Sequence, residues 1–224
     1  MWTAQTRPRL GSSYEPLYLL GDIARYASIH PSTARSWVRL IPGRSAPYAP
    51  PTGLSFLDLV SILVIRELRD IGVKPRRIRI AEKYLTERLG PYPFAHNTIW
   101  SDGHHVLFDP ESPLRTEVPQ EYLESADKRG QGAFVSLLRE DLHRVIYNEQ
   151  GIAVAWEPMG AVELDPSLQF GQPRVKGTRV LTQTVQRMHM AGDSIETISL
   201  VLRLPQRDVH EAIEWERRLL ARAA

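Results

Sequence analysis

The sequence of 224 residues contains no cysteine, which excludes disulfide bonds, catalysis by a thiolate and zinc sites built from cysteine. It also has no run of about 18 apolar residues, the length that a membrane-spanning helix requires. The first residues, Met1 to Arg7, lack the apolar stretch of a secretory signal peptide. We therefore expect a cytoplasmic protein with no membrane span.

Motifs of the common enzyme classes are missing as well. The sequence shows no Ser-His-Asp arrangement, no phosphate-binding loop and no His-Glu-x-x-His motif. Its acidic residues lie mostly at the charge-pair spacing of helix exteriors, whereas a metal-dependent nuclease needs carboxylates that converge on one site. A metal site at His96, His104 and His105 is the weaker alternative, because adjacent residues of a strand point to opposite faces. We expect a protein that is not an enzyme and that binds no metal or cofactor.

Charge is distributed unevenly along the chain. Residues 1–80 hold 12 Lys and Arg against 5 Asp and Glu, and the remainder holds 16 against 21. The first part therefore carries +7 and the rest −5, although the whole chain carries only +2. A basic N-terminal part is typical of a domain that binds nucleic-acid phosphates. Ordinary solvated arginines would produce the same count, so charge alone leaves both interpretations open.

The stretch from Leu20 to Arg39 predicts two short helices joined by a tight turn. The first helix spans about Leu20 to Tyr26, and Pro31 begins the second at a position where proline is favoured. The apolar face of the second helix is marked by Ala34, Trp37 and Val38. Its other face carries hydroxyl and guanidinium groups suited to phosphates and base edges, at Ser32, Thr33, Arg35, Ser36 and Arg39. This pattern indicates a helix-turn-helix, with an ordinary helical hairpin as the alternative.

The next segments continue the same domain. A loop rich in proline and glycine carries Arg44 and predicts a wing. Phe56 to Ile71 predicts a helix that is apolar on nearly all sides, so either its own domain or a partner subunit must bury it. A further helix begins near Lys74 and reaches Leu89, and its start offers additional phosphate contacts at Lys74, Arg76 and Arg77.

Over residues 17–90 this succession resembles the start of a MerR-like winged helix-turn-helix domain. The resemblance implies binding to operator DNA through Ser32, Thr33, Arg35, Ser36, Arg39 and Arg44. Helix-turn-helix proteins usually read two half-sites about one DNA turn apart, so we also expect a homodimer. The apolar helix Phe56–Ile71 is a candidate for its interface. Residues 1–16 are expected to form a flexible arm.

Residues 91–160 predict two β-hairpins, a connecting loop and one helix. Asp-Gly at positions 102–103 lies between two β-rich runs, a strong hairpin signal. The connecting loop is expected over residues 110–132 and the helix over residues 133–145. The expected strands are His96–Trp100, His104–Phe108, Ile146–Tyr147, Ile152–Trp156 and Ala161–Leu164.

The C-terminal part, residues 161–224, predicts a bundle of three helices that is similar to a second helix-turn-helix. Gly171 and Gly177 permit the turns before the first helix, which spans Leu181 to Met190, and Ser194 caps the second. Residues expected to be buried are Ile195, Ile198, Leu202, Val209, Ala212, Ile213 and Trp215, and Leu220 is placed on the same stripe of the last helix. That helix is acidic, which favours a structural or protein-contact role over a second DNA contact. Possible additional nucleic-acid contacts precede the bundle at Arg174, Lys176 and Arg179.

The landmarks of this part, Asp165-Pro166, Gly171-Gln172-Pro173 and Gly177-Thr178-Arg179, occur in the order of a short module assigned to VapB-type antitoxins of VapBC toxin–antitoxin systems. The resemblance implies a type II antitoxin that neutralises a PIN-like ribonuclease toxin and represses its own operon. The chain departs from a simple VapB antitoxin because its C-terminal part is predicted to fold. The alternative function is a MerR-like regulator that responds to a small ligand, held near the strands of Trp100 and Trp156.

The expected fold class is α+β and predominantly helical. It combines an N-terminal winged helix-turn-helix, central β-hairpins and a C-terminal three-helix bundle. The expected division is a flexible arm (1–16), a DNA-binding domain (17–90), a connecting part with the hairpins (91–160) and the antitoxin-type module (161–224).

Overall fold

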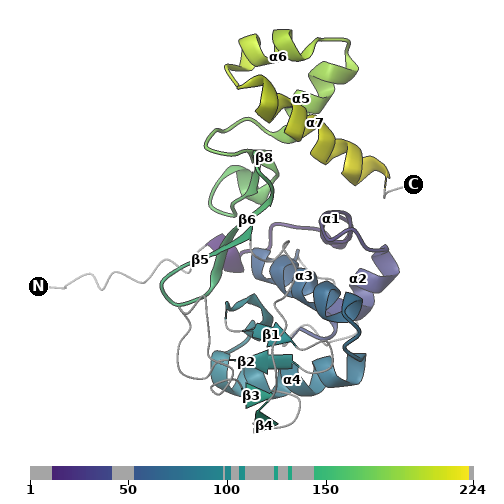
Figure 1. Cartoon of the computed structure of the whole chain (residues 1–224), viewed down its shortest axis with the longest axis vertical. Coiled ribbons are helices and arrows are strands. Elements are labelled where there is room, and N and C mark those ends of the chain that lie inside the picture. The colour runs from purple at the N-terminus through teal and green to yellow at the C-terminus, as the bar shows by residue number, and fades with distance from the viewer. Residues whose placement is uncertain are drawn as a thin grey trace, which may run out of the picture.

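The computed structural model describes residues 12–41, 53–97, 99–101, 106–108, 124–125, 131–132 and 144–221. Helices α1–α4 and a first small sheet occupy one end of the molecule, α5 and α6 occupy the other, and a second sheet lies between them (Figure 1). Both sheets have four antiparallel strands in sequential order. The mixed, mostly helical architecture agrees with the fold class predicted from the sequence.

The central element is α3 (Phe56–Asp70), which is apolar on nearly all sides. Its start is closed by a capping box, in which the Ser55 amide donates to Asp58 at 2.6 Å and the Asp58 amide donates to Ser55 at 3.2 Å. Gly72, at φ +101°, lies two residues beyond its end. Twelve of its fifteen residues are buried, which a helix of this composition requires.

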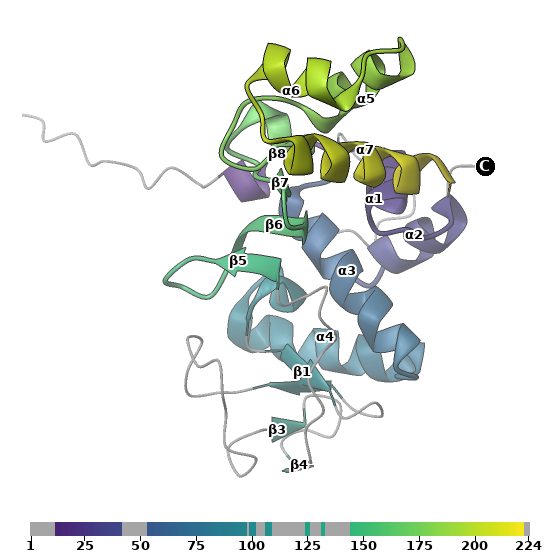
Figure 2. The same cartoon turned by 45° about the horizontal axis from the view of Figure 1, so that its top comes forward.

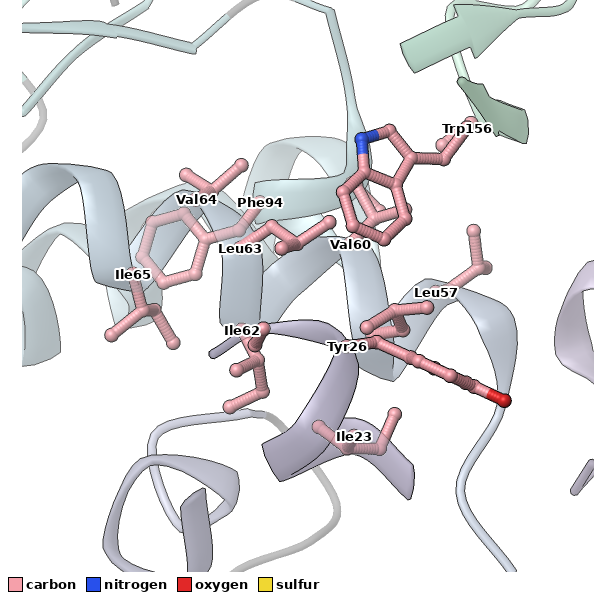
Figure 3. Close-up of a cluster of buried hydrophobic side chains, with 14 of the residues drawn as sticks. Ile23, Tyr26, Leu57, Val60, Ile62, Leu63, Val64, Ile65, Phe94 and Trp156 are labelled. Carbon is pink, nitrogen blue, oxygen red and sulfur yellow. The ribbon is translucent and has the colours of Figure 1, made fainter. Parts of the chain in front are cut away.

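Elements of the same chain bury α3. These are the short turn η1 (Ser12–Tyr14), α2 (Pro31–Val38), α4 (Pro75–Leu89), the short turn η2 (Pro93–Ala95) and strand β6 (Ala153–Met159). Ile23 and Tyr26 of α1 (Leu20–Tyr26) belong to the same core. Figure 3 shows Ile23 and Tyr26 on one side of this helix and Phe94 and Trp156 near its other sides. The helix predicted as Phe56–Ile71 is therefore enclosed within one chain. Its proposed use as a dimer interface is wrong, since its apolar side chains have no free surface left for a partner.

The first sheet confirms one predicted hairpin with shifted bounds. Strands β1 (Ile99–Ser101) and β2 (Val106–Phe108) are paired, with Ile99 opposite Phe108, and the turn between them lies outside the described residues. His96 does not join β1 but forms an isolated bridge with Ile152. Two further short strands, β3 (Glu124–Ser125) and β4 (Gln131–Gly132), lie in the segment predicted as a connecting loop.

The second sheet contains the other predicted hairpin. Strand β5 (Val145–Tyr147) pairs with β6 (Ala153–Met159), and β7 (Val162–Leu164) pairs with β6 on its other side. A fourth strand, β8 (Arg174–Val175), was not predicted. The helix expected over residues 133–145 lies almost wholly outside the described residues, and Val145 begins a strand instead of ending that helix.

The C-terminal bundle consists of α5 (Thr182–Met190), α6 (Ile195–Leu202) and α7 (Gln206–Ala221) around a small core. The predicted cap is confirmed, because the Ser194 side chain accepts the Thr197 amide at 3.2 Å. Ile195 and Leu202 are less buried than Ile198 but pack against this core. The prediction for Leu220 is wrong, since it is 55% exposed whereas Leu219 is 3% exposed.

Helix α7 belongs to both cores. Its first half contributes Val209, Ala212 and Ile213 to the bundle, and its second half contributes Trp215 and Leu219 to the core around α3. The ring of Trp215 stacks on Tyr26 with centroids 6.5 Å apart and meets Trp156 edge-on at 5.9 Å. Figure 2 shows α7 lying over α1. Trp215 is thus buried as predicted, but outside the core of its own bundle.

Among the residues that the structure describes, no helix combines the length and the apolar composition needed to cross a membrane.

Candidate nucleic-acid interface

Local hydrogen bonds define the two helices of the predicted helix-turn-helix. The Leu19 amide donates to Asp22 at 3.0 Å at the start of α1. Ser28 adopts a left-handed conformation, φ +58°, and this reverses the chain between the helices. The His30 ring accepts the Ser32 amide at 3.2 Å and thereby caps α2, which begins at Pro31 as predicted.

Contacts with α3 hold the helix pair in place. The guanidinium of Arg66 donates to the Ala27 carbonyl in the turn at 2.9 Å and pairs with Glu67 at 2.9 Å. Three alanines are buried between or beside α1 and α2, at Ala24, Ala27 and Ala34. Their small side chains allow close approach of the helices. The orientation of α2 is therefore set by the core that encloses α3.

The outer face of α2 is polar and open. Ser32, Arg35, Ser36 and Arg39 are exposed, and Thr33 is half-buried. Two hydroxyls already have local partners: Ser36 donates to the Thr33 carbonyl at 2.8 Å, and Ser32 lies 2.7 Å from His30. None of the ion pairs within the described part of the chain involves Arg35 or Arg39. Both guanidinium groups can therefore face an anionic ligand.

Further cations lie at the start of α4. Lys74 is the residue before this helix, and Arg76 and Arg77 lie in its first turn. Lys74 and Arg76 are exposed, and Arg77 is half-buried. Figures 1 and 2 both show α4 beginning on the side of the molecule where α2 lies. The two basic segments, 39 residues apart at Arg35 and Lys74, thus share one side; Arg44 of the predicted wing lies outside the described residues.

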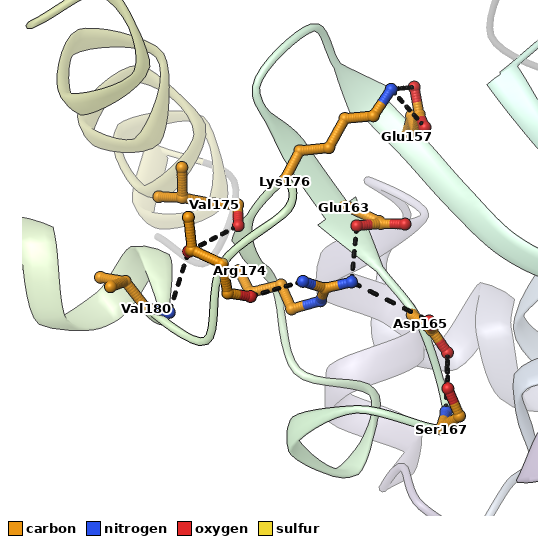
Figure 4. Close-up of polar contacts among 9 residues, drawn as sticks. Glu157, Glu163, Asp165, Ser167, Arg174, Val175, Lys176 and Val180 are labelled. Atoms are coloured by element: carbon orange, nitrogen blue, oxygen red, sulfur yellow. Dashed lines mark hydrogen bonds and ion pairs between the residues drawn. The ribbon is translucent and has the colours of Figure 1, made fainter. Parts of the chain in front are cut away.

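The three cations predicted before the C-terminal bundle have different environments. Arg174 is 5% exposed, donates to Glu163 at 2.7 Å and lies 3.9 Å from Asp165 (Figure 4). Its enclosed guanidinium argues against the predicted nucleic-acid contact and ties β8 to β7. Lys176 pairs with Glu157 at 2.7 Å, whereas Arg179 is exposed.

Sequence reasoning missed the aromatic cluster behind the helix pair. Tyr26 at the end of α1 packs against Trp215, and burial raises the pKa of its hydroxyl to about 12. The tyrosine therefore stays neutral and serves packing. Trp156 also fills this core and is 4% exposed, so it leaves little surface for the small ligand expected there, and the side chain of Trp100 is outside the described ones. Residue spacing carries no signal for contacts between residues so far apart in the chain.

No group of three or more His, Asp or Glu within the described ranges is placed to hold a metal ion. His104 and His105 lie outside those ranges. Burial lowers the pKa of His96, which favours its neutral form.

The chain is similar to one protein family, one named protein and one solved structure. Residues 162–215 match the family described as "Protein of unknown function (DUF433)". A Mycobacterium tuberculosis protein named "Putative antitoxin VapB45" is 24% identical over 208 residues, which is 82% of this chain and 87% of that protein. The crystal structure of Rv2018 from Mycobacterium tuberculosis has the same fold, with a TM-score of 0.64 and 20% identity. That match covers 89% of this chain and 98% of the other.

Proposed function

We propose that this protein is a non-enzymatic antitoxin that binds operator DNA through α2 and neutralises a PIN-like ribonuclease toxin. The observation that carries the DNA-binding part is the open polar face of α2, where Arg35 and Arg39 are exposed on a helix fixed by Arg66 and the core. Guanidinium groups on a second helix of this kind can enter a major groove and bind guanine edges or phosphates. The start of α4 would add phosphate contacts through Lys74, Arg76 and Arg77.

The toxin partner is proposed on different grounds. The relative named as an antitoxin matches this chain over most of both lengths. In addition, the match to the DUF433 family covers most of the C-terminal bundle and its lead-in, and the landmarks of this part resemble a module of VapB-type antitoxins. The bundle leaves the polar face of α2 uncovered, so one molecule can hold a toxin and an operator together.

Operator binding is tested by Arg35→Ala and Arg39→Ala, measured by gel shift and fluorescence anisotropy on the upstream region of its own reading frame. Each substitution should weaken binding by about 1–3 kcal/mol if the arginine reads a base. If the arginine contacts only a phosphate, its removal should instead reduce the slope of log affinity against log salt concentration by about one. The matched control is Arg187→Ala, an exposed arginine on α5. Unchanged binding by the double variant would reject α2 as the reading helix.

We also propose that the protein binds as a homodimer, because two half-sites on DNA call for two-fold symmetry. The interface would lie outside α3, whose surface is already enclosed. Light scattering at micromolar concentration, with and without DNA, tests this. A monomer mass under both conditions would disprove it.

A further inference from the structure

The loop between β7 and β8 carries unusual backbone strain. Gln169, Phe170 and Gly171 follow one another in the left-handed region, at φ +48°, +56° and +69°. A non-glycine residue in this region costs free energy, and here two occur in succession. Such a conformation persists only where surrounding contacts hold it.

Hydrogen bonds hold this loop at both ends. Asp165 accepts the amide of Ser167 at 2.8 Å and its hydroxyl at 2.6 Å, a contact drawn in Figure 4. The Tyr18 hydroxyl donates to the Gly171 carbonyl at 2.9 Å. A side chain at Gly171 would collide with the Tyr18 hydroxyl, so this contact requires glycine at position 171.

The same loop presents an exposed aromatic side chain. Phe170 is 78% exposed, although burying a phenylalanine side chain is worth about 1.5–3 kcal/mol. Beside it lies a hollow of about 350 Å³, which we call the Phe170 hollow, lined by Glu15, Leu17, Pro166, Ser167, Leu168, Gln169, Phe170 and Arg179. A well-anchored loop that presents an apolar ring beside a hollow is suited to contact with another molecule.

The charges around the Phe170 hollow favour a polypeptide over a nucleic acid. Arg179 is exposed, and no ion pair within the described part of the chain involves it. Glu15 supplies a carboxylate to the same hollow, which offsets the charge of Arg179. The lining therefore has no net positive charge that would attract a polyanion. A protein segment can place one carboxylate at Arg179 and an apolar side chain on Phe170.

The position of the hollow leaves the DNA-binding face free. In Figures 1 and 2, the purple turn η1 (Ser12–Tyr14) and the chain between β7 and β8 lie on the side of the molecule opposite α2. A protein bound there would not cover Arg35 or Arg39.

We propose that the Phe170 hollow is the docking site for the toxin, receiving an exposed segment in which an apolar side chain lies next to a carboxylate. The apolar side chain packs on Phe170 and Leu168, and the carboxylate pairs with Arg179. This assignment rests on the antitoxin function proposed above. It adds the surface and the chemistry of the segment that binds there.

The test uses the full-length chain and, as probe, the purified protein encoded by the reading frame next to its own. Affinity is measured by calorimetry for wild type, Phe170→Ala and Arg179→Glu. Phe170→Ala should weaken binding about 30-fold, as removal of an aromatic anchor does, and Arg179→Glu about tenfold. Phe170→Tyr and Arg179→Lys should restore most of the affinity, because they keep the ring and the charge.

Two controls make the result specific. Leu200→Ala removes another exposed apolar side chain, 80% exposed on α6, and should leave the affinity within about twofold. Operator binding by Phe170→Ala should equal that of wild type, which shows that the variant is folded.

The possible outcomes separate the two proposals. No binding by wild type would overturn the antitoxin function itself and this site with it. Binding by wild type that Phe170→Ala and Arg179→Glu leave unchanged would overturn only the docking site. Loss of binding in Leu200→Ala alone would place the toxin on α6 instead. Weaker operator binding in Arg179→Glu, with the protein probe still bound, would show that the hollow contacts nucleic acid.

Discussion

Helix α3 and helix α6 are both rich in apolar residues, but the surrounding chain buries them to different extents. Twelve of the fifteen residues of α3 are buried, whereas Ile198 is the one buried residue among the eight of α6. On α6, Leu200 and Val201 are 80% and 59% exposed. An apolar sequence thus leads to full burial only where enough other elements can pack around it, as η1, α2, α4 and η2 do around α3.

The same difference explains the length and position of α7. Three short helices enclose few residues, so the C-terminal bundle has a small core of its own. Helix α7 has 16 residues and extends past that core, and its second half packs on the core around α3 through Trp215 and Leu219. The C-terminal bundle therefore derives part of its stability from the larger core around α3. Four substitutions test this comparison in three experiments, beginning with the largest expected effect.

Trp215→Ala should destabilise the protein by about 3–5 kcal/mol, because it removes a buried aromatic ring from the contact between the two units. It should also let α5–α7 unfold before the helices around α3. Denaturant unfolding, followed by circular dichroism and by hydrogen exchange of individual amides, measures both effects. The control Leu220→Ala changes a neighbouring side chain that is 55% exposed and should cost less than about 0.5 kcal/mol. Equal costs for the two variants would show that α7 is not the link.

Leu59→Ala and Ile198→Ala compare the two cores directly. Both side chains are completely buried, and removing them should cost about 2–5 kcal/mol. Leu59 should lie near the upper end, since helices enclose it on all sides and the cavity cannot close. Ile198 should lie near the lower end, since its half-buried neighbours Ile195 and Leu202 can move inward. Denaturant midpoints give the order, and a larger loss for Ile198→Ala would reverse this view of the cores.

Tyr18→Phe should have the smallest effect, about 1 kcal/mol, because it removes one buried hydrogen bond to Gly171 and keeps the ring. It should also loosen the loop that presents Phe170, seen as faster hydrogen exchange at Gly171 and Gln172. Tyr14→Phe is the matched control, because this tyrosine is more exposed and its ring contact with Tyr92 is kept. The same exchange rates in both variants would show that Tyr18 does not hold the loop.

Much of the local structure could be predicted from the sequence. The bounds of α1 and α2, the cap at Ser194 and both β-hairpins follow from residue types at short spacing. These features depend on hydrogen bonds and apolar periodicity within a few turns of chain, so residues close in sequence determine them. The polar face of α2 belongs to this group, since Arg35 and Arg39 are placed there by helical spacing alone.

Other features required the tertiary structure. Arg174 looks like a solvent-exposed cation in the sequence, but Glu163 and Asp165 bind it in a nearly buried position. Strand β8 exists because β7 is beside it, and Val175 pairs with Val162. An apolar side chain such as Phe170 is expected to be buried, but it is exposed on a loop that hydrogen bonds at Asp165 and Tyr18 hold in place.

Sequence by itself determined which segments form helices, where they begin and which of their faces are apolar or charged, because those properties arise among neighbouring residues. The tertiary structure alone decided that α3 is enclosed within one chain, that Trp215 packs on Tyr26 and that Phe170 faces solvent. Each of these depends on residues that lie far apart in the chain. Their packing energies exist only once the whole fold has brought them together.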